Sequence, residues 1–172
     1  MREIIRAYTV SIADVATGKE LSLEIEDMAP PLIQDIKDPF HGGGMPGPVN
    51  VPLGVQLTEA RFKLASWNRN ILKQIGKAPG ERVRTTMRGA AVSEVDASTT
   101  PVMIVLDGRV SEADPDRWTR GQRSGIDYMV DAIVYYKHVV GNELVHEIDF
   151  LNFRQIVNGS DQLADVRAAL AF

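Results

Sequence analysis

The dipeptide Gly141-Asn142, set between two long segments rich in apolar and β-branched residues, most constrains what this chain can fold into. Gly-Asn supplies the positive φ angles that a two-residue β-turn requires, so residues 126–140 and 143–153 are predicted to form a hairpin. A tight turn also fixes the register, which places Tyr135 opposite Ile148 on an apolar face. One face of this hairpin is therefore expected to be buried in a core.

The same register makes a prediction about two of the three histidines. It sets His146 opposite Lys137 and turns His138 to the other side of the hairpin. The two imidazoles then cannot share a metal ion within one chain, although a pair contributed by two subunits stays open. We therefore expect no metal site and interpret both histidines as half-exposed strand residues.

Extended segments are also predicted outside this hairpin, because apolar and polar residues alternate there with a period of two. A run of glycine and proline at 39–48 favours an irregular loop through which no core element passes. The predicted strands are 8–15, 21–26, parts of 49–64, 82–95 and 102–110, with a turn at 17–19 and a hairpin loop at 96–101.

Two short helices are predicted between and after these strands. Ser66 is a candidate N-cap for a helix that ends at Gly76. The segment 158–161 is expected to cap a C-terminal helix, whose apolar stripe contains Leu163, Val166 and Leu170. The predicted fold class is mainly β: a β-sandwich or barrel subunit with long hairpins, one short mid-chain helix and a C-terminal helix.

Composition limits the classes of function that remain. The chain has 172 residues, no cysteine and a net charge of −4, from 19 basic and 23 acidic side chains. This length fits one domain, 1–172. The absence of cysteine excludes disulfide scaffolds, thiol catalysis and Cys-ligated zinc. The acidic balance argues against tight binding of duplex DNA, which needs clustered cations, and the apolar runs are too short for a membrane helix.

Two local motifs are interpreted as structural rather than chemical. His41-Gly42-Gly43-Gly44 matches the glycine-rich oxyanion segment of some esterases, but the accompanying nucleophile elbow is missing, because Gly121-Gln122-Arg123-Ser124-Gly125 has the wrong spacing. We expect no catalytic residue and no cofactor. Arg82, Arg84 and Arg88 share one strand face, which favours a solvated or ion-paired surface, with an intersubunit or nucleic-acid contact as the alternative.

Several motifs follow one another in a fixed order from about Glu24 to the C-terminal end. They are Gly42-Gly43-Gly44-Met45 with Pro48-Val49 and Leu53-Gly54, then Met87-Arg88-Gly89, then Tyr135-Tyr136-Lys137 with the run from Gly141 to Asp149, and last the run from Val157 to Leu163. Together they resemble the major tail tube protein family of contractile-tailed bacteriophages and of phage-tail-like bacteriocins. Residues 10–19 depart from the usual start of that family.

The resemblance implies a structural subunit and not an enzyme. Six copies would form a ring with a continuous inner β-barrel, and stacked rings would form a hollow tube inside a contractile sheath, which conducts DNA at ejection without binding it specifically. The implied partners are further copies of the chain, the sheath, the tape measure protein, the baseplate hub and the tail terminator. Assembly in the host cytoplasm and a final location in the virion tail follow from the same resemblance.

Contacts between rings or between subunits are expected at loops, because loops at a barrel rim can become ordered on assembly. A tube protein of a type VI secretion machine and a monomeric ligand-binding β-barrel are the alternatives to a phage tube. The expected contact residues are Phe40, His41, Gly42, Gly43, Gly44, Met45, Ser98 and Thr99.

Overall fold

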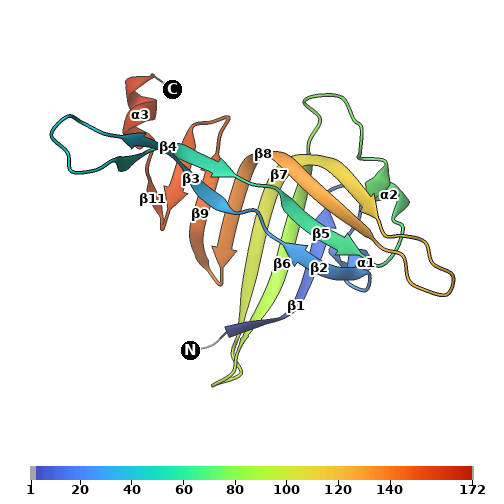
Figure 1. Ribbon diagram of the computed structural model, residues 1–172. Coiled ribbons are helices and arrows are strands. Elements are labelled where there is room, and N and C mark those ends of the chain that lie inside the picture. Colours follow the sequence, from blue (N-terminus) through green and yellow to red (C-terminus); the bar gives the residue numbers. More distant parts are fainter. Residues whose placement is uncertain (1–2, 172) are drawn as a thin grey trace.

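The computed structural model describes residues 3–171, so the ends of the predicted domain, residues 1–2 and 172, lie outside it. The chain folds mainly into antiparallel strands with three short helices (Figure 1), which confirms the predicted fold class. None of the helices in the described part of the chain is long and apolar enough to cross a bilayer. The elements are β1 (Glu3–Ile12), α1 (Gly18–Leu21), β2 (Ile25–Ala29), β3 (Ile33–Phe40), β4 (Val49–Leu57), β5 (Ala60–Leu64), α2 (Arg69–Leu72), β6 (Val83–Ser93), β7 (Thr99–Pro115), β8 (Ile126–Val140), β9 (Glu143–Asp149), β10 (Arg154–Val157), β11 (Ser160–Asp161) and α3 (Ala164–Ala169).

One large sheet organises the molecule, with strands in the order β1-β6-β7-β8-β9-β10-β11. One edge of strand β8 pairs with β7, and its other edge pairs with two different strands in succession. Its first part, Ile126 to Val130, pairs with β5, whereas Tyr135 to Val140 pairs with β9. Strand β5 in turn pairs with β2. The sheet therefore divides along β8 into two branches.

The division occurs where β7 and β8 bend. Ala132 has a φ of 47°, and the register between the two strands shifts on either side of Arg109. At Gly108 the backbones are so close that a Cβ would lie 2.8 Å from the Asp131 carbonyl oxygen. Bulges and a glycine at a close approach bend a sheet sharply, and here they fold one branch over the other.

Folding the branches together creates one buried core. Phe62 of β5 stacks on Tyr128 of β8, with ring centroids 5.3 Å apart, and both side chains are fully buried. The same cluster includes side chains of β1, β6, β7 and β9, so both branches contribute to it. Its most buried members are Val10, Ile12, Leu21, Ala60, Phe62, Leu64, Ile71, Met87, Leu106, Val110, Ile126, Tyr128 and Val130.

The predicted hairpin around Gly141 is confirmed, but its register is wrong beyond the first two pairs. Val140 pairs with Glu143 as expected, and a bulge then shifts the register between His138 and Val139. As a result Tyr136, not Tyr135, lies opposite Ile148, and those two side chains are the buried ones. One extra residue in a strand reverses the face of every residue after it, and arithmetic from the turn alone cannot detect that insertion.

The predicted helices are partly wrong in position. The expected turn at 17–19 and the start of the expected strand at 21–26 form helix α1, where Thr17 and Glu20 make a reciprocal capping box. Helix α2 is shorter than predicted, and Asn68, not Ser66, caps it. A helix of four residues is too short to show a 3.6-residue period, so only its cap can indicate it.

The C-terminal prediction needs a similar correction. Asn158 and Gly159 both have positive φ and form the turn between β10 and β11, so they do not cap a helix. Helix α3 follows and has no buried residue, and the apolar side chains of Val166 and Leu170 are about half exposed. The apolar stripe is therefore present, but it does not pack into the core of this chain.

A two-stranded arm formed by β3 and β4 extends away from the main sheet (Figure 1). The predicted irregular loop at 39–48 is shorter than expected, because Pro39 and Phe40 pair with Asn50 and Val49. Strand β3 was not predicted, since the prolines on both sides of it indicate a loop. A ribbon of two strands has free edges where proline costs no ladder hydrogen bond, so Pro39 is tolerated.

The bend at Gly108 gives a testable prediction. Gly108→Ala should lower the free energy of unfolding by about 1–3 kcal/mol, because the added methyl group would also meet Val130 Cγ1 at 2.8 Å. Gly43→Ala is the matched control, since no atom lies within 4 Å of a Cβ there. Urea unfolding of both variants would test this, and equal midpoints would contradict the close approach.

Candidate assembly surfaces

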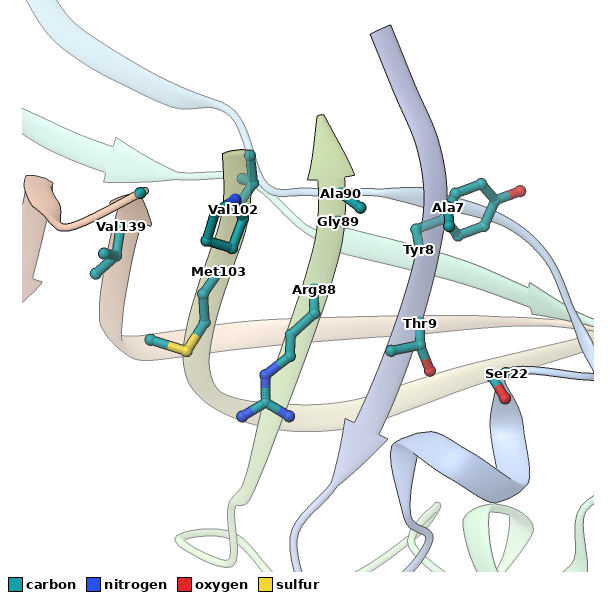
Figure 2. Close-up of a pocket in the computed structure, with 12 residues that line it drawn as sticks. Ala7, Tyr8, Thr9, Ser22, Arg88, Gly89, Ala90, Val102, Met103 and Val139 are labelled. Atoms are coloured by element: carbon teal, nitrogen blue, oxygen red, sulfur yellow. The ribbon is translucent and has the colours of Figure 1, made fainter. Parts of the chain in front are cut away.

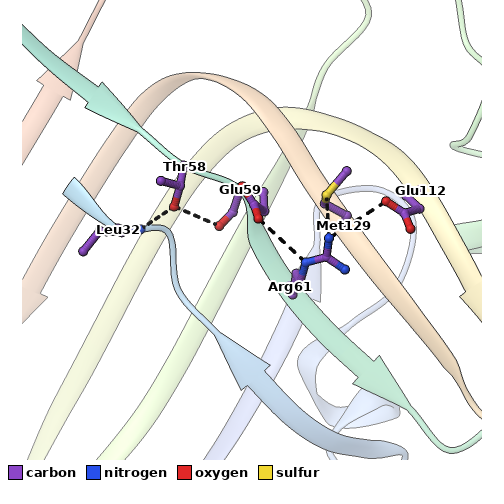
Figure 3. A network of polar contacts seen from close by, with 6 residues as sticks. All are labelled: Leu32, Thr58, Glu59, Arg61, Glu112 and Met129. Atoms are coloured by element: carbon purple, nitrogen blue, oxygen red, sulfur yellow. Dashed lines mark hydrogen bonds and ion pairs between the residues drawn. The ribbon is translucent and has the colours of Figure 1, made fainter. Parts of the chain in front are cut away.

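A polar network holds the arm at its root (Figure 3). The Leu32 N–H donates to Thr58 Oγ1 at 2.9 Å, and the Thr58 N–H donates to the Leu32 carbonyl at 3.0 Å. These two bonds join the residues just before β3 and just after β4. Arg61 of β5 then lies 3.9 Å from a Glu59 carboxylate oxygen and 4.0 Å from one of Glu112 on β7. The arm is therefore attached to the main sheet at a defined place.

The tip of the arm carries six of the eight predicted contact residues. The Met45 N–H donates to the Gly42 carbonyl at 3.0 Å and closes the turn, while the Gly42 N–H donates to Met45 Sδ at 3.2 Å. His41 Nε2 lies 3.1 Å from the Met45 carbonyl oxygen. Gly43 and Gly44 have open space around them, and Phe40 is 59% exposed. These residues form a compact, exposed turn.

The arm exposes large apolar side chains along both of its strands. An isolated ribbon of two strands is marginally stable at best, and exposed apolar patches mark surfaces that another protein covers. Only the root of the arm packs against the core, through Ile33, Val55 and Leu57. The exposed apolar side chains of the two strands are Ile36, Phe40, Val49, Val51 and Leu53.

The remaining predicted contact residues, Ser98 and Thr99, lie on a different hairpin. The loop that was predicted at 96–101 is tighter in the structure, since Thr99 already pairs with Val92. Ser98 Oγ donates to Asp96 Oδ1 at 2.9 Å, and this bond stabilises the turn. Figure 1 places this tip at the bottom of the view and the arm tip at the left. The two predicted sets therefore form separate surfaces.

The large sheet has a second face on which none of the residues described by the structure is fully buried. In β6 the residues facing the core, Thr85 and Met87, are buried, whereas Arg84, Thr86 and Arg88 are half-buried or exposed. The same contrast holds along the paired strands, so the face runs across the sheet. We call it the bare face. Its residues are Thr9, Ser11, Arg84, Thr86, Arg88, Met103, Val105, Asp107, Tyr135, Lys137, Val139, Glu147 and Asp149.

Charges on the bare face are interleaved. Arg84 donates from Nε and Nη2 to both carboxylate oxygens of Asp107, each at 2.7 Å, and its guanidinium carbon lies 5.8 Å from the Tyr135 ring centroid. The Tyr135 hydroxyl donates to Glu147 at 3.1 Å, and burial, with the Glu147 carboxylate second, raises the pKa of Tyr135 to about 12. The ion-paired interpretation of the arginine stripe is confirmed for Arg84. Its partner Asp107 was missed, although the register of the predicted 82–95 and 102–110 hairpin could have indicated it.

Part of the bare face is hollowed. A groove of about 500 Å³ runs across β1, β6 and β7, with Thr9, Arg88 and Met103 among its lining residues (Figure 2). Among residues 3–171, Arg88 has no ion-pair partner. Arg82 precedes β6 and lines a neighbouring hollow with Asp107. The predicted stripe of three arginines is therefore one paired residue between two that face open space.

The two strand histidines are on one face, contrary to prediction. The bulge that shifts the hairpin register sets His138 directly opposite His146. The imidazole of His138 also contacts Tyr136 edge-on, at 6.4 Å between ring centroids. In the described chain no group of three or more potential ligands could hold a metal ion. The two imidazoles therefore interact as neighbouring charges within the hairpin.

Ser124, the serine nearest to an esterase-like spacing, donates its hydroxyl to the Asp116 carbonyl at 3.2 Å. It lies in the loop between β7 and β8, whereas His41 to Gly44 form the arm tip. The structure therefore gives the glycine-rich segment and Ser124 separate structural roles, in two different turns.

An antiparallel β subunit with an exposed apolar arm and a bare sheet face belongs to the class of proteins that assemble through their own surfaces. The family model of the phage tail tube protein FII matches residues 11–170. The chain therefore belongs to the phage tail tube protein FII family, and it is a structural subunit that assembles with other tail components into the tube of a virion tail. No curated protein sequence gives a significant match.

The histidine pair predicts a pH dependence. Burial, with the charge of His146 second, lowers the pKa of His138 below its ordinary value of 6.5. The unfolded chain then takes up this proton at a higher pH than the folded chain, so the free energy of unfolding should fall as the pH falls below about 6.5. His138→Gln should flatten this slope between pH 7 and 5 relative to the wild-type chain. Urea titrations across this range measure the slope, and identical slopes in the variant and the wild type would contradict the coupling.

Proposed function

We propose that six copies of this chain form a ring, that rings stack into a hollow tube inside a contractile sheath, and that the tube conducts DNA at ejection. The sheath, the tape measure protein, the baseplate hub and the tail terminator are its proposed partners, and assembly takes place in the host cytoplasm. The subunit has no catalytic role in this proposal. The observation that carries it is a wide sheet with one covered face and one bare face, which ends in the edge strands β1 and β11.

The edges of the sheet support ring formation. Strand β1 pairs with β6, and its outer edge is bridged at Ile12, by Ala16. At the other end of the sheet β11 is only two residues long. An open edge presents unpaired backbone donors and acceptors, which pair readily with another chain. A neighbouring copy that adds its opposite edge to β1 extends the sheet, and repetition around an axis closes it.

The bare face is the proposed wall of the bore. In a closed ring the bulkier side of each subunit fits the larger outer circumference, and here that side carries the second branch of the sheet, α2 and the root of the arm. Helix α1 lies at the β1 border of the bare face, where the Thr9 hydroxyl donates to the Gly18 carbonyl. On the bare face three cations stand among three anions: Arg84, Arg88 and Lys137 with Asp107, Glu147 and Asp149. A wall without excess positive charge lets DNA slide, because each cation–phosphate contact adds affinity.

The arm is the proposed contact between subunits. Hydrogen bonds between Leu32 and Thr58 fix the arm where it joins the main sheet. Beyond that point its apolar side chains are exposed, so a neighbouring subunit is expected to cover them. The arm tip and the tip at Ser98 and Thr99 then supply contacts between rings or within a ring.

Microscopy of the purified chain tests the proposal directly. Negative-stain images and size-exclusion chromatography over a range of concentrations should show rings or hollow rods with six-fold end views. A strict monomer at every concentration would overturn the proposal, and rods with another symmetry would correct the number of copies.

The arm prediction uses two substitutions on its exposed strands. Phe40→Ser combined with Val51→Ser should abolish rods, because the apolar surface that a neighbour covers is lost. Thermal unfolding of the monomer should change little, since both side chains are solvent-exposed. Leu23→Ser is the control, because Leu23 is 93% exposed and lies outside the arm. Normal rods from the arm variant would exclude the arm as a required contact.

The bore prediction places a new cation on the bare face. Thr86→Lys should leave rods intact but slow DNA release from complete particles, and added salt should relieve the delay because the new phosphate contacts are screened. Asn70→Lys, exposed on α2, is the control for added charge. Release at the wild-type rate in the Thr86 variant would show that this face does not meet DNA.

A further inference from the structure

The loop between β7 and β8 carries three arginines that have no partner within the described chain. Arg117, Arg120 and Arg123 are all exposed, and none of them makes an ion pair with residues 3–171. The nearest acid in sequence, Asp116, is already engaged, because Lys63 Nζ donates to it at 2.8 Å and the Gly125 N–H at 3.1 Å. Residues 117–125 contain no acid, so the loop is locally cationic on an acidic protein.

An exposed tryptophan lies among these arginines. Trp118 is 75% exposed and contacts Trp67 edge-to-face, with ring centroids 5.5 Å apart at 67°. This contact holds the irregular loop against the segment before α2. Arginine and tryptophan are the residue types most enriched at the energetic centres of protein interfaces. The loop therefore has the chemistry of a docking surface for an acidic and partly apolar partner.

The chain also carries an acidic and partly apolar surface, which lies at the opposite ends of β7 and β8. The tip of the β6–β7 hairpin places Val95, 76% exposed, between the exposed acids Glu94 and Asp96. Hydrogen bonds from Ser93 and Ser98 lower the pKa of Asp96, so this acid stays charged. The adjacent β8–β9 tip adds the exposed Glu143. Glu94 contacts Arg6, but neither tip itself contains a cation.

One chain cannot make this contact with itself. The acidic tip precedes Thr99 and the cationic loop follows Pro115, so the 17 residues of β7 separate them. Figure 1 shows the loop at the far right of the view and the β6–β7 tip at the bottom. A contact between two different surfaces of identical chains is heterologous, and it repeats from copy to copy instead of ending at a dimer.

We propose that the Arg117–Arg123 loop of one copy docks on the acidic tips of a second copy and so joins successive subunits of the tube. Trp118 then packs on Val95, while the guanidinium groups pair with the carboxylates of Asp96 and Glu143 and join Arg6 at the Glu94 carboxylate. The proposal rests on the proposed function, since it names the two surfaces that meet. Elongation in this arrangement weakens as salt concentration rises.

Charge reversal with complementation tests the proposal. One variant carries Arg117→Glu, Arg120→Glu and Arg123→Glu, and a second carries Glu94→Arg, Asp96→Arg and Glu143→Arg. Each alone should fail to form rods. Mixed together, they should form rods, because each reversed surface then meets an opposite charge. The matched control for the first variant reverses three exposed cations elsewhere, Lys19, Arg69 and Lys73, and should form rods as the wild type does.

Four outcomes separate the possibilities, with circular dichroism confirming that every variant folds. Loss in each single variant and recovery in the mixture supports the proposal. Normal rods from the loop variant overturn it while leaving the tube function intact. Normal rods combined with lost retention of duplex DNA also overturn it and assign the loop to nucleic acid. Absence of rods from the wild type under all conditions contradicts the proposed function itself.

Discussion

The bend in β7 and β8 is the constraint on which the rest of the structure depends. Because Gly108 lets the two backbones approach closely and Ala132 accepts a positive φ, β8 pairs with β5 in its first part and with β9 in its second. The β5 branch folds over one face and seals the core, so the other face has nothing to bury. A subunit with one closed face and one bare face is suited to form a wall.

Hydrogen bonding within the bare face neutralises part of the charge on this proposed wall of the bore. The two hydrogen bonds between Arg84 and Asp107 pair opposite charges on neighbouring strands, and the neutral Tyr135 hydroxyl donates to the Glu147 carboxylate. Exposed ion pairs contribute little to stability, so their effect is better understood as local neutralisation. The net charge of −4 reflects acids elsewhere, including those of the two hairpin tips.

Sequence reasoning predicted the parts of the fold that depend on local chemistry. The alternation of side chains and the Gly141 turn indicated the long strands and their hairpins, and the motif order indicated the family. Helix α1, the bulge opposite His138 and strand β3 were missed, because each depends on a cap, an inserted residue or a free edge that periodicity does not record. At the candidate surfaces the arm tip was predicted as a loop, and of the two apolar strands behind it β4 falls within the predicted strand region 49–64 whereas β3 was missed.

In the proposed tube the arm, the strand edges and the two charged ends make contacts in different directions, and together these contacts give the assembly a polarity. Edge pairing extends the sheet sideways through backbone hydrogen bonds, which carry little sequence information. The proposed contact between the cationic loop and the acidic tips depends on side chains and has a direction, because the two surfaces differ. A subunit that joins sideways through its backbone and lengthwise through its charges can form rings that all face the same way. The proposed tube, with one end for the baseplate and the other for the terminator, needs that polarity.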